Sequence, residues 1–317
     1  MNNNLANIKK SVFFLNKNDC VAIPTETVYG LAANAYSSKA VKKIYALKKR
    51  PSNNPSIVHY SSLNQLKKDC ELNKNFFILY KKFCPGPITF ILKLKKESRI
   101  SKIVTNNKTT VAVRFPKNKL TQKLLKILNY PLAAPSANIS TNISPVSAKD
   151  VREEFGKKIK FILNDGSSKV GLESTIINLV KKPEILRHGG IEIEKISKTL
   201  KKKIKFKSKK NKISAPGQAK VHYSPHITMR LNVKNPLKDE AYLLIKKRKL
   251  KNKNYFYLTK NKNLKEAGKN LYKILRLIKK MKYKKISVEK IPKKGLGVTI
   301  NDRLIRAAKQ HEKFNSN

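Results

Sequence analysis

Long apolar runs and cysteine are both scarce in this chain. No window of about 18 residues is both apolar and uncharged, so the sequence predicts no membrane-spanning helix. The apolar piece Val12–Leu15 is too short for a signal-peptide core, and we expect it to lie in the first helix of the fold. The three cysteines, Cys20, Cys70 and Cys84, have no metal-ligand spacing. This argues against a disulfide framework and favours a reducing, cytoplasmic location.

The common signature loops of enzymes are also absent. The sequence has no GxxxxGK[ST] phosphate loop, no GxGxxG turn, no HExxH or CxxC motif and no GxSxG elbow. Its many serines and threonines are therefore not expected to be activated nucleophiles. We interpret them as hydrogen-bonding groups around a polar ligand.

Acidic residues are few, with 19 Asp and Glu against 72 Lys and Arg, which gives a formal net charge of +53. Such a charge is typical of nucleic-acid-binding proteins. Only ten of the basic residues are arginine, however, and arginine is the side chain that binds phosphates and bases as a planar fork. We favour an enrichment of surface lysine, with weak RNA attraction as a side effect. The few arginines then become candidates for specific roles.

Strand and helix patterns alternate from the N-terminus to residue 200. Cys20–Pro24 has the pattern of a buried strand, and Ser37–Lys49 has helical spacing behind a serine cap. We predict an α/β domain with an open, twisted mixed sheet over residues 1–200. Residues 201–226, a charged run followed by SAPGQAKVHYSP, are predicted to form a linker. Residues 227–317 are predicted to form a second, smaller α/β domain.

Polar side chains cluster where the predicted strands end. PTETVYGL (Pro24–Leu31) follows the apolar run CVAI, and APSAN (Ala134–Asn138) follows another short strand. In TVAVRF, Thr110 and Arg114 share one face of a strand, and an arginine there needs an anionic partner. Such loops let backbone N–H groups approach a phosphate closely. Together they predict a polar pocket along the strand ends.

Taken singly, some of these residues carry weaker arguments. Lys48 lies at a helix end, where the helix dipole alone favours a cation by about 0.3–1 kcal/mol. A lone histidine such as His59 is more often structural than a ligand. Arg50, beside Pro51, is less easily explained by a structural role.

Nine short motifs in a fixed order resemble the YrdC family, the threonylcarbamoyl-AMP synthases. They are PTETVYGL, the K-x-R-P turn at Lys48–Pro51, NPSIVH, PGPIT, VAVRFP, APSAN, the Ser144-Pro145 pair, ESTI and LRHGG. The match covers roughly residues 5–200. The HY-containing linker and Gly295–Ala308 resemble the longer, two-domain form of these enzymes. The resemblance implies an open sheet around a basic concave site, a Rossmann-like second domain, and a linker that covers the site as a lid.

The resemblance also implies a reaction. L-Threonine, bicarbonate or carbon dioxide, and ATP would give threonylcarbamoyl-AMP and pyrophosphate, with Mg²⁺ held mainly by the ATP phosphates. Downstream tRNA threonylcarbamoyl-transferase proteins would use the adenylate to modify an adenosine beside the anticodon. The resemblance leaves room for a weak contact with tRNA, and no membrane partner is expected.

Motif positions supply the site residues that the resemblance implies. The residues that would stabilise charge during catalysis are Lys48, Arg50 and Arg187. The threonine site would consist of Thr27, His59, Arg114, the backbone of Ala134, and Ser174. The ATP site would consist of Lys48, Arg50, Asn54, Thr110, Ser136, Asn138, Ser144, Arg187 and Tyr223.

Two other functions compete with this interpretation. A basic double-stranded-RNA-binding or ribosome-associated factor could use the same concave surface, but clustered arginines and exposed aromatics would be expected. A carbamoyl-transfer domain of the larger hydrogenase-maturation type would include zinc-finger and acylphosphatase segments, which this sequence lacks. Small polar groups at successive strand ends favour the synthase.

Deletion of residues 214–317 should leave a first domain that binds ATP but turns over poorly, because the predicted lid and Tyr223 are lost. ATP binding and threonine-dependent pyrophosphate release, measured on the same sample, check this. Full turnover by the shortened chain would show that the linker is no lid.

Overall fold

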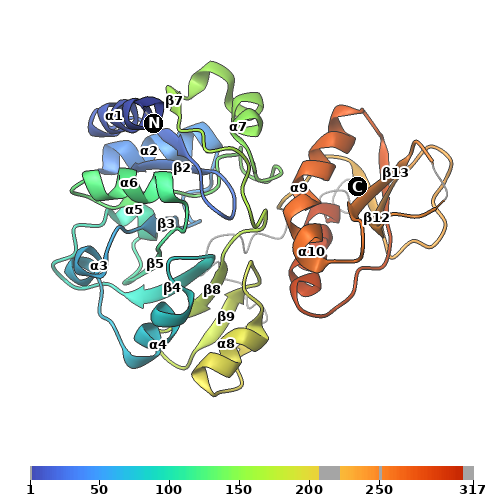
Figure 1. The fold of residues 1–317 in the computed structure, drawn as a ribbon. Coiled ribbons are helices and arrows are strands. Elements are labelled where there is room, and N and C mark those ends of the chain that lie inside the picture. The colour runs from blue at the N-terminus through green and yellow to red at the C-terminus, as the bar shows by residue number, and fades with distance from the viewer. Residues whose placement is uncertain (1, 207–221, 250–251, 310–317) are drawn as a thin grey trace.

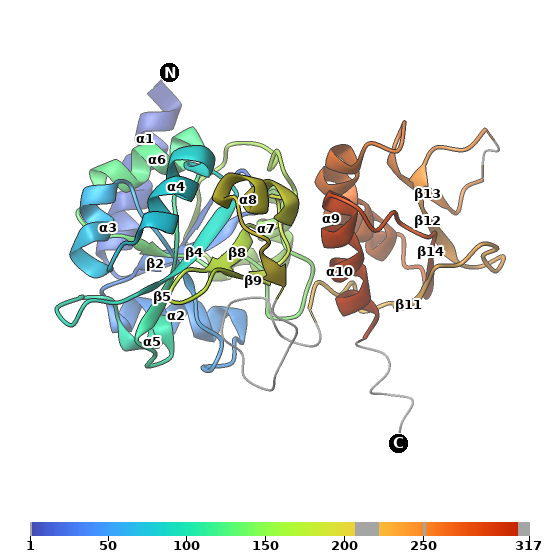
Figure 2. The same cartoon turned by 90° about the horizontal axis from the view of Figure 1, so that it is seen from below.

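The computed structural model describes residues 2–206, 222–249 and 252–309, which form two α/β units (Figure 1). The first, coloured blue to yellow, contains a ten-stranded sheet, and the second, orange to red, contains a four-stranded sheet. Two helices of the second unit, α9 (Leu264–Lys280) and α10 (Leu296–Ala308), lie on the side that faces the first unit in both views (Figures 1 and 2). They form the inner layer between the two sheets.

The large sheet is mixed, as the sequence predicts for an α/β fold. Its strand order is β10-β9-β8-β4-β5-β3-β6-β2-β1-β7. Neighbours pair both ways: β1 is antiparallel to β2 but parallel to β7. The strands are β1 (Val21–Ile23), β2 (Gly30–Asn34), β3 (Ile57–His59), β4 (Ile88–Lys93), β5 (Thr110–Arg114), β6 (Leu132–Ala133), β7 (Phe161–Ile162), β8 (Thr175–Asn178), β9 (Glu184–Arg187) and β10 (Lys205–Phe206).

Most helices of the first unit begin at a side-chain cap. Ser37 accepts a hydrogen bond from the Ala40 N–H, and Ser147 forms a reciprocal capping box with Asp150. Ser62 caps the helix Leu63–Asp69 by accepting a hydrogen bond from the Gln65 N–H. The helices are α1 (Asn2–Asn16), α2 (Ser38–Lys48), α3 (Leu63–Asp69), α4 (Lys74–Phe83), α5 (Lys102–Thr105), α6 (Lys119–Ile127), α7 (Ala148–Phe155) and α8 (Ile193–Leu200), with a 3₁₀ turn at Gly156–Lys158.

The two faces of the large sheet are covered differently. Alternate residues of each strand enter different cores: Ala22 joins the main core with α2, α3, α4 and α8, whereas Val21 and Ile23 pack against α1 and α6. On the other half of that second face, the apolar cluster consists of strand residues alone. These are Ile57, Ile91, Ala112, Ile176 and Leu186. The half-face formed by β3, β5, β4, β8 and β9 is therefore where a ligand can approach the strands.

A β-bulge brings Arg187 to this half-face. β8 and β9 are antiparallel, but their register shifts between Ile176 and Ile177, so Arg187 pairs with Ile176 while Ile185 pairs with Ile177. Strict alternation would place Leu186 and Arg187 on opposite faces. The extra residue in the bulge re-aims the arginine side chain, and strand period alone does not predict this.

The second unit contains a parallel sheet of order β11-β14-β12-β13. Its strands are β11 (Thr228–Leu231), β12 (Ala241–Lys246), β13 (Tyr255–Thr259) and β14 (Lys285–Val288). Its core includes Leu271 and Tyr272 of α9 and extends to Val28, Ile143 and Leu172 of the first unit. The two units therefore share one apolar interface.

Some elements are missing from the expectation drawn from sequence. The strand β2, GLAAN, has small residues of low strand propensity and forms because both of its edges are paired. The helix α4, the short helix α5 and the strands β10 and β11 were also unexpected. In the charged run after residue 200, Lys205–Phe206 pairs with β9. Residues 207–221 of the predicted lid lie outside the described residues, and the proposed domain limits stay a prediction.

The aromatic cluster around Phe76 gives a test of the main core. Phe76 is fully buried, with its ring centroid 5.1 Å from that of Phe90. Phe76→Ala should lower the free energy of unfolding by about 3–5 kcal/mol, because it leaves a cavity. The neighbouring Phe77, 43% exposed, is the matched control, and Phe77→Ala should cost less than about 1 kcal/mol. Equal losses in chemical denaturation would contradict this core assignment.

Candidate active site

One pocket of the first unit gathers most of the residues predicted to bind a ligand. Its lining includes three arginines and a single carboxylate, Glu173. This balance of charge indicates an anionic ligand. The lining residues are Thr25, Thr27, Val28, Tyr29, Gly30, Arg50, Ile57, His59, Arg114, Ala134, Pro135, Ser136, Glu173, Ser174, Arg187 and His222.

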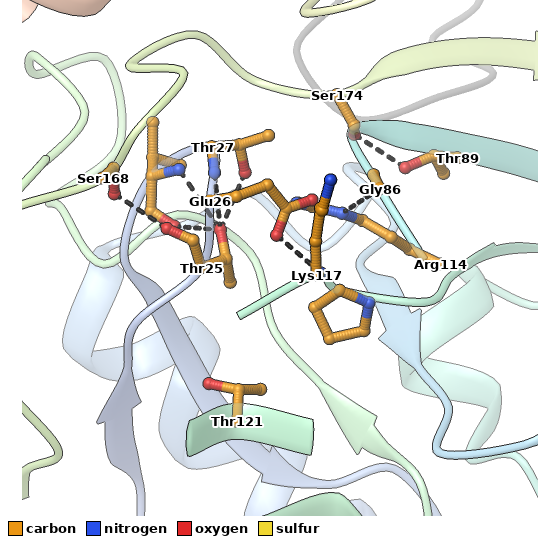
Figure 3. Close-up of polar contacts among 12 residues, drawn as sticks. Thr25, Glu26, Thr27, Gly86, Thr89, Arg114, Lys117, Thr121, Ser168 and Ser174 are labelled. Atoms are coloured by element: carbon orange, nitrogen blue, oxygen red, sulfur yellow. Dashed lines mark hydrogen bonds and ion pairs between the residues drawn. The ribbon is translucent and has the colours of Figure 1, made fainter. Parts of the chain in front are cut away.

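The PTETVYGL turn forms one wall of this pocket and is fixed by its own hydroxyls. The Thr25 Oγ1 accepts from the backbone N–H groups of Thr27 and Val28, at 3.2 and 3.3 Å. It also lies 2.8 Å from the Thr27 Oγ1. The Thr25 carbonyl accepts a hydrogen bond from Ser168 (Figure 3). The threonines thus form a rigid polar edge at the end of β1.

Arg50 and Arg187 are each held along one side by main-chain carbonyls. The Arg50 Nη2 donates to the Asn54 Oδ1 and to the Pro55 carbonyl, both at 2.7 Å. The Arg187 Nη2 donates to the carbonyl and the hydroxyl of Ser174, at 2.8 and 3.0 Å. Burial lowers the pKa of both guanidinium groups. Their orientation is therefore set before any ligand arrives.

Arg114 already has the anionic partner that its position on a strand demands. Its Nη2 lies 2.7 Å from the Glu26 Oε1, and both side chains are buried. The other Glu26 oxygen accepts from the backbone N–H of Lys117 (Figure 3). Glu26, from the PTETVYGL turn, thus fixes the guanidinium at the pocket wall. Sequence reasoning assigned this carboxylate no role.

Lys48 lies behind the pocket and is not part of its lining. The side chain is 1% exposed, and its Nζ donates to the carbonyls of Ser136 (2.6 Å) and Asn138. Burial, with the charge of Arg50, lowers its pKa well below the ordinary lysine value. In this structure the ammonium group therefore holds the APSAN loop against the end of α2.

His59 faces the pocket as a neutral side chain. Neither ring nitrogen has a hydrogen-bond partner of ordinary geometry among the described residues. Burial, reinforced by the charge of Arg114, lowers its pKa to about 3. Because the imidazole is buried at the pocket and its nitrogens have no well-aligned partner among the described residues, His59 is a candidate ligand-binding group.

Some of the remaining predicted residues line the pocket, and others lie outside its lining. Thr27, Ala134, Ser136 and Ser174 line it directly. Ser144 is fully buried beside Glu173.

Three others lie outside its lining. Asn54 orients Arg50, and the Asn138 amide holds the carbonyls of Ile139 and Asn142. Thr110, at the start of β5, lines a separate small pocket with Lys108 and Ser56.

Tyr223 does not line the pocket in this structure. Tyr223 is fully buried against Tyr272 and Arg303 of the second unit, and its hydroxyl has no partner among the described residues. His222 lines the pocket instead. The HY pair in the linker led to a predicted role for Tyr223 alone, and the packing shows that His222 is the one that lines the pocket.

Comparison with known proteins gives a consistent result. The family model described as "Telomere recombination" (Sua5, YciO and YrdC) matches residues 14–189, and the model "Threonylcarbamoyl-AMP synthase, C-terminal domain" matches residues 191–309. The chain belongs to this Sua5/YrdC family. It is 34% identical to the threonylcarbamoyl-AMP synthase of Pyrococcus abyssi, over 95% of this chain and 94% of that protein. It is 33% identical to the Bacillus subtilis enzyme of the same name, over 95% and 92%.

One solved structure resembles this chain over both units. The crystal structure of P. abyssi Sua5 complexed with L-threonine matches with a TM-score of 0.87 at 33% identity, covering 95% of this chain and 94% of that one. The two-domain Sua5 architecture inferred from the linker and Gly295–Ala308 is thus confirmed.

The low pKa of His59 makes a prediction about pH. Because the unfolded chain takes up a proton near pH 6.5 and the folded chain does not, stability should fall as pH drops from 6.5 towards 3. Between pH 6.5 and 5 the His59 contribution would be about 2 kcal/mol. His59→Gln should flatten that part of the stability curve, and the His59 ring resonances should not titrate above pH 5. A ring midpoint near 6 would contradict the assignment.

Proposed function

We propose that this protein is an L-threonylcarbamoyladenylate synthase, a nucleotidyltransferase. It converts L-threonine, bicarbonate or carbon dioxide, and ATP into threonylcarbamoyl-AMP and pyrophosphate. The product serves threonylcarbamoyladenosine formation beside the anticodon of tRNA. The observation that carries this proposal is full-length similarity to Sua5, including a structure holding L-threonine, combined with a pocket whose arginines are fixed before ligand binding.

The reaction needs positioned cations and donors, and no enzyme nucleophile. The threonine amine adds to carbon dioxide and loses a proton to solvent, which gives a carbamate. A carbamate oxygen then attacks the α-phosphorus of ATP, the bond to the bridging oxygen breaks, and pyrophosphate leaves with that electron pair. Negative charge grows on the phosphate oxygens during this step. Donors fixed in a closed pocket stabilise such charge without reorganising.

The threonine site would lie along the PTETVYGL wall. Arg114, oriented by Glu26, would bind the threonine carboxylate. Thr27 and the neutral His59 would supply hydrogen bonds to the bound amino acid, together with the Ala134 backbone and Ser174. In this position the imidazole gains the partners that it lacks in the free pocket.

The ATP site would extend from the APSAN loop across the pocket. Arg50 and Arg187 would face the phosphates, and Ser136 would line their path. Asn54 and Lys48 would act on the site through Arg50 and the APSAN loop. Asn138, Ser144, Tyr223 and, farther along β5, Thr110 complete the proposed ATP set.

Magnesium would enter with the nucleotide. Among the described residues, no group of three His, Cys, Asp or Glu side chains could hold a metal ion. The carboxylate of the pocket, Glu173, is engaged by Arg303 and Tyr272. Triphosphate oxygens are good Mg²⁺ ligands, so the donor set fits an ion brought in as MgATP.

The proposal leaves the biological partners as predictions. Downstream tRNA threonylcarbamoyl-transferase proteins would receive the adenylate, weak tRNA contact would follow from the net charge, and the protein would act in the cytoplasm. No helix within the described residues is long and apolar enough to cross a membrane.

Pyrophosphate release from MgATP by the purified protein tests the function. Release should require both L-threonine and bicarbonate, because the carbamate is the attacking group. Release indifferent to threonine, or none at all with tight RNA binding at moderate salt, would instead favour the RNA-binding alternative.

Arg50→Ala provides the matching inactive variant. Removing one fixed donor should lower kcat/KM by about 100-fold without unfolding the chain. Arg99, an exposed arginine that stacks on Tyr36, is the control, and Arg99→Ala should keep full activity.

A further inference from the structure

The buried side chain of Arg303, from α10 of the second unit, lies where four parts of the molecule meet. It is 1% exposed. Its Nε lies 2.8 Å from the Glu173 Oε2, its Nη1 2.5 Å from the Asp302 Oδ2, and its Nη2 donates to the His188 carbonyl at 2.7 Å. Its guanidinium carbon lies 4.6 Å from the ring centre of Tyr223. Each of the three guanidinium nitrogens of Arg303 thus contacts an oxygen atom.

Through Glu173, Arg303 reaches the wall of the pocket. Glu173 lines the pocket, directly precedes Ser174, and accepts a second contact from the Tyr272 hydroxyl at 2.9 Å. Although burial raises the pKa of Glu173, the charges of Arg303 and Arg187 lower it below its usual value. The ionised carboxylate therefore links the first unit to Arg303 and Tyr272 of the second unit, next to the proposed threonine site.

Through His188, the same arginine reaches the other side of that wall. Arg187 lines the pocket one residue before His188 and holds Ser174. At Gly189 a β-carbon would lie 2.2 Å from the Thr175 nitrogen, so the loop after β9 packs directly on the start of β8. Outside the pocket lining, the Thr299 hydroxyl of α10 also donates to the Gly189 carbonyl.

Arg303 also contacts residues 222–226, which we call the covering segment because His222 lines the pocket. Tyr223 is packed between Arg303 and the ring of Tyr272, and the His222 N–H donates to the Arg306 carbonyl. On its other side, Ser224 N–H donates to the Thr141 carbonyl of the first unit at 2.8 Å. His222 then lies in the pocket. The covering segment is therefore fixed from both units.

We propose that Arg303 is a positioning residue of the synthase. Its guanidinium fixes the relative positions of the Glu173-Ser174 wall, the Arg187-His188 turn and the covering segment. Packing of the second unit against the first therefore completes the active site. This rests on the proposed function. Lysine would not replace it, because a single ammonium lacks the planar fork that reaches all three acceptors.

A merely structural role would predict a different pattern of effects. A buried ion pair is in itself weak evidence for stabilisation, since desolvation offsets much of the attraction. Arg303→Met would also leave the buried Glu173 carboxylate without its cation, which could unfold the chain for a trivial reason. The double variant Glu173→Gln/Arg303→Met removes both charges together and avoids this.

The experiment combines kinetics with amide hydrogen exchange on full-length protein. Arg303→Met and the double variant should lower kcat/KM for L-threonine by about 10–100-fold through misplaced pocket groups. Both should also speed exchange of the amides in residues 222–226. Arg303→Lys should recover only part of either effect.

Thr299→Val is the matched control, because it removes another α10 contact to the first unit without touching Glu173 or Tyr223. It should change kcat/KM by less than about twofold and leave exchange in residues 222–226 unchanged. Equal effects of Thr299→Val and the double variant would reduce Arg303 to one interface contact among several. Wild-type kinetics and exchange in the double variant would overturn the proposal.

Failure of the proposed function would look different. A wild-type protein without threonine-dependent pyrophosphate release would refute the synthase, whereas the exchange measurement would still report whether Arg303 holds the covering segment. An active wild type with an unaffected double variant would refute only the role of Arg303.

Discussion

Burying three guanidinium groups around one small pocket is the constraint on which the rest of this structure depends. A buried cation is costly unless hydrogen bonds and charges replace its water. Each arginine is therefore tied along one side: Arg50 to the loop before β3, Arg114 to Glu26, and Arg187 to Ser174. These ties orient the cations, and a fixed cation is what a developing phosphate charge requires.

The pocket side chains Arg114 and Arg187 are the last residues of strands β5 and β9 of the large sheet. Strands β3, β5, β4, β8 and β9 form one half-face lined by apolar strand residues. The polar turns that follow or precede these strands surround it. The main core on the opposite face holds the strands in place. The packed face of the sheet therefore stabilises the fold, while the residues at the strand ends are available to bind a ligand.

The second unit extends this logic beyond the first sheet. Its helices α9 and α10 contact Glu173 and the His188 carbonyl, which directly follows Arg187, rather than a remote surface. Close backbone approach makes this contact specific: a β-carbon on Gly171 would lie 2.6 Å from the Lys269 Cα. Because this interface lies beside the pocket, the packing of the two units also determines the geometry of the site.

Most of the strands and helices, and the motifs that surround the pocket, could be predicted from sequence because they depend on local chemistry. The apolar run Cys20–Pro24 predicted β1, a serine cap predicted the start of α2, and the ordered motifs from PTETVYGL to LRHGG identified the family. Tertiary structure decided what no local pattern contains. The bulge re-aims Arg187, main-chain carbonyls of the APSAN loop hold Lys48, and Glu26 pairs with Arg114. His222 lines the pocket, whereas Tyr223 packs against the second unit. Buried charge selects its partner by proximity in the folded chain, and that proximity exists only after the sheets and the two units have packed.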